Sequence, residues 1–184
     1  MAFPTAEILT NRLAPLAASH GLDIEDVKAT PAGKKSQVVI RLDGDTRPSS
    51  DTLEVMTQEI SEFFDELEDK GELNFGAGYT LEVSTPGVDL PLTLPRHFRR
   101  NRGRLINKDG QIYRLGALSD DEQSVIVVPR TKKSGKKDVP VQVARIDNLT
   151  GAVVEIEFAK PPESETQAAA LHFEEAAQQA IRED

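Results

Sequence analysis

The residues best suited to chemistry in this sequence are cations, which form two dense groups. The first group consists of arginines, whose planar guanidinium groups can each hold a phosphate through two hydrogen bonds. Its members are Arg96, Arg99, Arg100, Arg102 and Arg104. The second group surrounds a Ser-Gly pair typical of a hairpin tip, and its members are Arg130, Lys132, Lys133, Lys136 and Lys137. The second group alone fits a solvated loop equally well, but the two groups together favour RNA as a partner.

The net charge of −9 at first argues against nucleic acid, because like charges repel. The charge is unevenly distributed, however. Residues 1–91 hold 7 Lys+Arg and 17 Asp+Glu, residues 92–161 hold 14 and 8, and residues 162–184 hold 1 and 6. The middle segment is therefore strongly basic, and we expect it to face an anionic partner while its neighbours do not.

Aromatic side chains in the basic segment are few. Single-stranded nucleic acids are usually held on exposed aromatic rings as well as by cations. The segment offers only Phe98, Tyr113 and Phe158, all at positions where we expect them in a core. The sequence therefore predicts contact with the RNA backbone or with a structured surface, and no reading of base sequence.

Other chemistry has weaker support. Ser84 and Asp89 flank a turn that could be a catalytic loop, but a nucleophilic serine needs a base, and no histidine has a suitable neighbourhood. The chain has no cysteine and three histidines, so we expect neither metal nor cofactor. It lacks a secretion signal and a long apolar run, which predicts a soluble cytoplasmic protein without a membrane partner. We also expect a monomer and no DNA partner.

The elements that must position these residues begin with an α+β domain at residues 1–91. Apolar residues at helical spacing predict helices over 5–19 and 51–70, and period-2 runs predict strands over 22–30, 36–43 and 79–84. Asp51 and Glu54 resemble a capping box at the start of the second helix. The order helix, strand, strand, helix, strand predicts a sandwich with both helices on one face of a three-stranded sheet.

Short strands dominate residues 92–161. Pro91 and Pro95 disfavour a helix in the connector, and five strands follow within about 55 residues, with Asp109-Gly110 as a hairpin turn. This spacing predicts a small closed or nearly closed barrel, of the SH3 or OB type. The tail over residues 162–184 is acidic, rich in alanine and helical in pattern, and it fits either a docked helix or a frayed appendage.

The junction between the two parts carries a signature. Residues 82–92 read EVSTPGVDLPL, and Phe98, Arg100 and Gly103 follow shortly after. This pattern resembles the signature of the RimP family of bacterial ribosome maturation factors, and the residues that match it at the junction include Glu82, Ser84, Pro86, Gly87 and Asp89. The chain departs from the family at Leu90, where an arginine is usual.

The resemblance implies a two-domain, non-enzymatic assembly factor whose second domain is an SH3-like barrel. It also implies binding to the immature small (30S) ribosomal subunit through 16S ribosomal RNA and small-subunit proteins, including the twelfth, which members bind through the barrel. From the residues alone, three alternatives remain open. They are a general RNA-binding adaptor, a hydrolase that uses the Ser84 turn, and a protein-binding scaffold.

Overall fold

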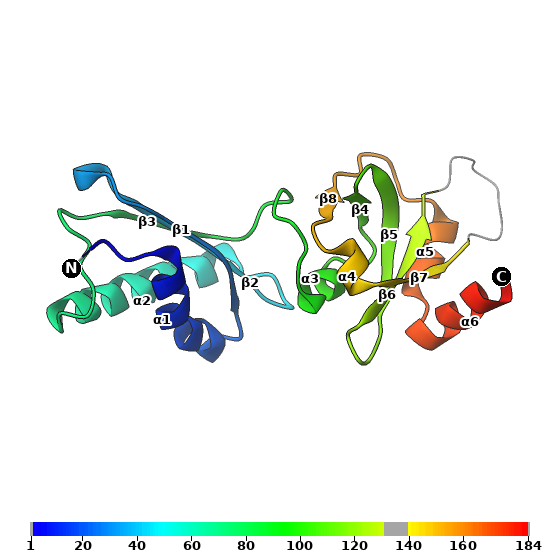
Figure 1. The fold of residues 1–184 in the computed structure, drawn as a ribbon, viewed down its shortest axis with the longest axis horizontal. Coiled ribbons are helices and arrows are strands. Elements are labelled where there is room, and N and C mark those ends of the chain that lie inside the picture. The colour runs from blue at the N-terminus through cyan, green and yellow to red at the C-terminus, as the bar shows by residue number, and fades with distance from the viewer. Residues whose placement is uncertain (1, 131–139, 184) are drawn as a thin grey trace. The chain divides into compact units, whose positions relative to one another are not determined.

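The computed structural model describes residues 2–130 and 140–183 of the chain, and the side chains up to residue 180 (Figure 1). The chain divides into two compact units, Met1–Pro86 and Gly87–Asp184. Each unit has its own buried core.

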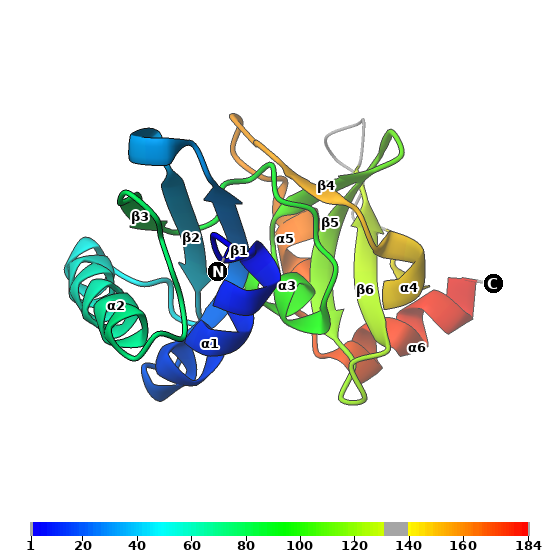
Figure 2. The ribbon, with the colours of Figure 1, turned by 60° about the vertical axis from the view of Figure 1, so that its left-hand side comes forward.

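The first unit has the predicted order of elements. They are α1 (Ala6–Ser19), β1 (Asp23–Thr30), the short 3₁₀ helix η1 (Gly33–Lys35), β2 (Gln37–Asp43), α2 (Ser50–Asp69) and β3 (Thr80–Ser84). The sheet has the order β1-β2-β3, with β1 and β2 antiparallel and β2 and β3 parallel. The expected α+β arrangement of this unit is therefore confirmed (Figure 2).

The core of this unit follows from the two periodicities. Val38, Ile40 and Leu42 alternate along β2 and are fully buried, as period 2 requires for one face of a sheet. The stripe on α2 that covers this face includes Ile60 and Phe64. The predicted capping box was wrong: the N-cap is Ser49, whose hydroxyl accepts from the Thr52 backbone N–H at 3.2 Å.

The second unit is built on one antiparallel sheet. Its first part contains α3 (Pro95–Arg100), β4 (Leu105–Lys108), β5 (Gln111–Leu118), β6 (Ser124–Pro129), β7 (Gln142–Arg145), α4 (Ile146–Leu149) and β8 (Val153–Glu155). The strand order is β7-β6-β5-β4-β8, and no pairing joins β7 to β8 among the described residues. The sheet is therefore open in the described part of the chain, and an SH3-like barrel stays a prediction.

Helix α3 was not predicted, because Pro95 was taken as a residue that disfavours helix. Pro95 is the first residue of α3, where its missing N–H has no intrahelical partner to lose and its fixed φ suits the helix. The connector before it is tied to the sheet, since the Leu92 backbone exchanges hydrogen bonds of 2.8 Å with Gly151 and Ala152. Leu92 and Phe98 anchor both segments in the core.

The acidic tail is docked. It forms α5 (Glu163–Ala170) and α6 (Phe173–Glu183) (Figure 1). Ala168 and Ala176 are buried with Ile126 and Val128 of β6. The alternate residue Val127 points to the opposite face, where Phe98 and other residues of the connector, α3 and α4 lie. Both faces of the sheet are thus covered, and the tail belongs to the second unit.

Candidate functional site

Helix α3 presents three of the predicted arginines together. Arg96, Arg99 and Arg100 are three and four residues apart, so they share one side of the helix. Phe98 lies on the other side and is fully buried, which fixes the helix against the sheet. Arg99 is exposed and lies 3.7 Å from Glu122, whereas Arg96 and Arg100 are half-buried and Nη1 of Arg100 is buried.

A histidine within the arginine cluster holds the start of this helix. His97 Nδ1 accepts from the backbone N–H groups of Thr93 at 3.0 Å and Leu94 at 3.1 Å. An imidazole nitrogen that accepts two hydrogen bonds carries no proton, so Nδ1 acts here as the helix cap. Nδ1 of His97 is thus occupied by the backbone of the connector.

Arg102 is directed at the tail. Its Nε donates to the carbonyl of Ala169 and its Nη2 to the carbonyl of Leu171, both at 2.9 Å. These carbonyls lie at the C-terminal end of α5, where backbone acceptors lack helical partners and a cation is favourable. Arg102 thus fastens the tail to the segment after α3, while Arg104 is exposed and lies 3.4 Å from Asn101 Oδ1.

The second cationic group falls mostly outside the described residues. Arg130 is exposed, and its backbone N–H donates to the carbonyl of Ile112 at the end of the β5 and β6 pair. Lys132, Lys133, Lys136 and Lys137 lie outside the described residues. Their role in binding stays a prediction.

Arg114 was not predicted as a site residue, yet it is the most buried cation of the described chain. Its side chain is 1% exposed, and it forms a fork with Glu157, at 3.0 Å from Nη1 to Oε1 and 2.6 Å from Nη2 to Oε2. Its Nε donates to Oε1 of Glu165 at 3.1 Å, and its Nη1 also donates to the carbonyl of Gly103. The signal for this role was a lone arginine in the apolar strand QIYRLGAL.

The electrostatics of this network follow from burial and pairing. Burial alone would lower the pKa of Arg114, but the hydrogen bond and charge of Glu157, followed by those of Glu165, raise that pKa above its ordinary value. The hydrogen bond from Arg114 lowers the pKa of Glu157 despite its partial burial. Arg114 and Glu157 therefore stay ionised at neutral pH, and the network joins β5, the segment after β8 and α5.

Two arginines hold the signature turn at the end of the first unit. Arg41 Nη1 donates to Ser84 Oγ at 2.9 Å and to the carbonyl of Thr85 at 3.3 Å, and Arg47 Nη2 donates to the carbonyl of Pro86 at 2.9 Å. Ser84 thus meets a cation where a nucleophile would need a base. These contacts give the signature residues of this turn a structural role, because they hold the backbone of the turn in place.

The other signature residues are placed around this turn. Glu82 lies exposed on β3 opposite Val39. A Cβ on Gly87 would come within 2.6 Å of Asp89 Oδ1, so the absence of a side chain at Gly87 lets Asp89 fold back over the turn. Leu90 follows, and its backbone N–H donates to the Gly87 carbonyl at 3.3 Å.

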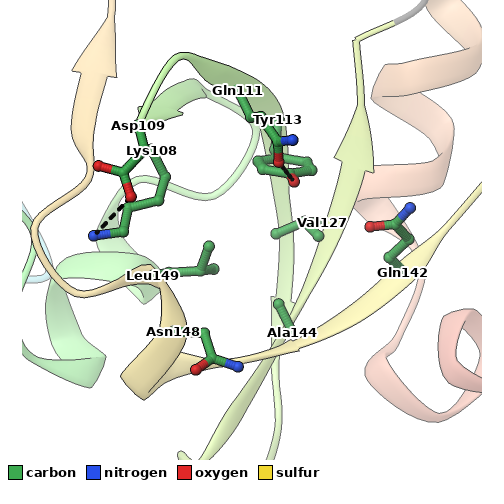
Figure 3. Close-up of a pocket in the computed structure, with 9 residues that line it drawn as sticks. All are labelled: Lys108, Asp109, Gln111, Tyr113, Val127, Gln142, Ala144, Asn148 and Leu149. Carbon is green, nitrogen blue, oxygen red and sulfur yellow. Dashed lines mark hydrogen bonds and ion pairs between the residues drawn. The ribbon is translucent and has the colours of Figure 1, made fainter.

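A groove opens beside α4 on the face of the second unit's sheet to which Val127 points, which we call the inner face (Figure 3). Its volume is about 380 Å³, and its lining comes from β4 to β7 and α4. The lining residues are Lys108, Asp109, Gln111, Tyr113, Val127, Gln142, Ala144, Asn148 and Leu149. This groove was not predicted, because its residues are separated in the sequence and are ordinary for strands and turns.

The structure also revises the expectation about aromatic residues. Phe98 is in the core as predicted. Phe158 is 95% exposed, so its predicted core position was wrong, and Tyr113 is only partly buried at the wall of the groove. Aromatic surface is therefore exposed on this unit.

Two further kinds of site are absent from the described part of the chain. It contains no cluster of three or more His, Asp or Glu side chains that could hold a metal ion. None of its helices is both long and apolar enough to cross a membrane.

The fold and the placement of its cations define a two-unit α+β protein whose second unit presents an arginine-bearing helix. A family model described as the RimP N-terminal domain matches residues 12–89. A protein of Corynebacterium aurimucosum named Ribosome maturation factor RimP is 57% identical over 192 aligned positions, which cover 100% of both chains. Proteins with the same name from Corynebacterium diphtheriae and Corynebacterium kroppenstedtii are 51% identical, with 96% of each chain covered, and 45% identical, with 90% of this chain and 94% of the relative covered. The chain belongs to the RimP family.

Proposed function

We propose that this protein is a maturation factor for the small (30S) ribosomal subunit, which it binds in its immature form without catalysing a reaction. The observation that carries the proposal is the group of three arginines on one side of α3, of which Arg99 is exposed and Arg96 and Arg100 are partly exposed. Guanidinium groups at this spacing suit the phosphates of folded RNA, here 16S ribosomal RNA. The role implies a cytoplasmic protein.

The two units suit different partners. The first unit, residues 1–86, holds 7 Lys+Arg and 16 Asp+Glu, which favours contact with basic ribosomal proteins over contact with RNA. The second unit would meet both RNA, through α3, and the twelfth protein of the small subunit. A division of this kind keeps the phosphate contacts few and the binding reversible.

Co-sedimentation with separated small, large and joined ribosomal particles tests the proposal. The informative variant replaces Arg96, Arg99, Arg100 and Arg104 with alanine and keeps Arg102, because Arg102 holds the tail and its loss would disturb the fold. A matched control removes the same charge from the first unit by replacing four other cations, namely Arg12, Lys28, Lys34 and Lys35.

We expect the wild type and the control to bind free small subunits, and the α3 variant to lose most of this binding. Four phosphate contacts predict a slope of about −3 to −4 when the logarithm of the binding constant is plotted against that of the salt concentration. Equal binding to large subunits would favour a general RNA adaptor. Selective binding with almost no salt dependence would favour a protein-binding scaffold.

A further inference from the structure

The groove of the second unit is lined by both apolar and polar residues (Figure 3). Val127 and Gln142 are directly paired in the register of β6 and β7, so both side chains lie on the inner face of the sheet. Ala144 and Leu149 extend the apolar floor. Tyr113 forms one wall, and its hydroxyl donates to Oε1 of Gln111, which fixes the ring.

Two side-chain amides face the groove with hydrogen-bonding capacity to spare. Gln142 and Asn148 are exposed, and neither makes a hydrogen bond to another described residue. Each amide offers a donor and an acceptor side by side, the pattern that pairs with the edge of a nucleobase. The ring of Tyr113 supplies the flat surface on which such a base could stack.

A cation stands at one end of the groove. Lys108 Nζ donates to the carbonyl of Thr150 at 2.8 Å and lies 3.7 Å from Asp109 Oδ2. These contacts hold the ammonium group in one place, and a third donor of the ammonium remains for a phosphate oxygen. The groove therefore contains, within about 380 Å³, an aromatic ring, two amides and a cation.

We propose that this groove binds one unstacked base of single-stranded RNA, with Tyr113 as the stacking surface, Gln142 and Asn148 at the edge of the base, and Lys108 toward its phosphate. The inference rests on the proposed function, because it assumes an RNA partner, and it adds a contact that distinguishes bases. It also replaces the expectation from the sequence that the protein reads no base.

The observations favour a base over a peptide. A basic peptide would need carboxylates, but among the described residues that line the groove Asp109 is the one acid, and it already neighbours Lys108. An acidic peptide would find only that same lysine. A base is uncharged, flat and rich in donors and acceptors, and a ligand pocket of roughly 300 Å³ or more suits one nucleotide.

The test uses the full chain and fluorescently labelled hexaribonucleotides of adenine, cytosine and uracil, with binding followed by anisotropy. Tyr113→Leu removes the aromatic face and keeps apolar volume. The double variant Gln142→Ala, Asn148→Ala removes two exposed side chains, so it keeps the test valid if Tyr113→Leu fails to fold. Gln167→Ala is the matched control, because it removes an exposed amide from α5, which covers the opposite face of the sheet.

We expect Tyr113→Leu to bind the preferred hexamer about tenfold more weakly, the usual scale for the loss of one base stack. The double variant should lose the preference among the three hexamers, and the control should bind like the wild type. Amide NMR signals of Gln142 and Asn148 should shift when the hexamer is added.

Unchanged binding by both groove variants would overturn the inference. So would a shift of these amide signals with an extended peptide but not with RNA. If the groove variants lose binding to the hexamers while the wild type shows no preference for small subunits, the groove inference stands and the proposed function falls. If the wild type selects small subunits but the groove variants bind the hexamers as it does, only the groove inference falls.

Discussion

Replacing Arg114 should destabilise the second unit more than any other change to its charged residues. Arg114→Met keeps most of the side-chain volume but removes a guanidinium that is 1% exposed and makes four hydrogen bonds. Two carboxylates would then face each other, and Glu165 is fully buried. We expect a cost of about 3–5 kcal/mol in the free energy of unfolding, because a buried charge loses its partner.

Two companion variants separate charge from packing. Glu165→Gln leaves Arg114 paired with Glu157, so it should cost about 2 kcal/mol, the scale of one hydrogen bond to a charged group. Arg114→Met combined with Glu165→Leu should recover more than half of the loss, since well-packed apolar groups can replace a buried ion pair. The two changes should thus be strongly non-additive.

The assay is urea unfolding followed by tyrosine fluorescence. The chain has two tyrosines, Tyr79 in the first unit and Tyr113 in the second, so a Tyr79→Phe background reports the second unit alone. A smaller loss for Arg114→Met than for Glu165→Gln, or additive costs in the combined variant, would refute the reasoning that this ionic network locks the tail.

Three further predictions concern other positions. Burial, aided by nearby carboxylates, raises the pKa of Tyr79 to about 12, so the unfolded chain ionises first and the stability of the first unit falls between about pH 10 and 12. Spectrophotometric titration of Tyr113→Phe checks this, and a phenol that ionises near pH 10 would contradict it. Gly116→Ala should cost about 1–3 kcal/mol, because its Cβ would lie 2.8 Å from Ile126 Cγ2, and a lower melting temperature in calorimetry is the readout. His97→Ala should cost about 1 kcal/mol in urea unfolding and His97→Asn less, since only the second keeps a capping acceptor; equal losses would argue against the cap.

The sequence predicted the first unit well because its elements are long and periodic. The stripe on α2 and the alternation along β2 each identify one buried face, and both faces meet in one core. In the second unit the strands were predictable from their turns, but closure of the sheet depends on which edges pair, and hydrophobic patterns do not specify that. Helix α3 was not predicted because proline disfavours the interior of a helix but is favourable at the first position, which Pro95 occupies.

The candidate site was predictable by residue type and not by role. Arg96, Arg99, Arg102 and Arg114 look alike in a sequence, yet two line the outer side of α3 and two hold the tail. The partners that decide this are remote along the chain, since Glu165 is 51 residues from Arg114. The groove could not be predicted either, because its lining residues come from four strands and a short helix that are separated along the chain.

The docked tail changes what the uneven distribution of charge along the chain implies for binding. Residues 87–184 hold 15 Lys+Arg and 15 Asp+Glu, so the second unit is neutral as a whole once the acidic tail is counted. The tail covers one face of the sheet and meets Arg102 and Arg114, while Arg99 of α3 is exposed. A neutral unit attracts RNA little at long range, because steering depends on the summed charge. Under the proposed function, binding would come from short-range contacts at α3 and the groove. Such contacts would favour a fitted RNA surface over RNA in general and would let the protein leave when that surface changes.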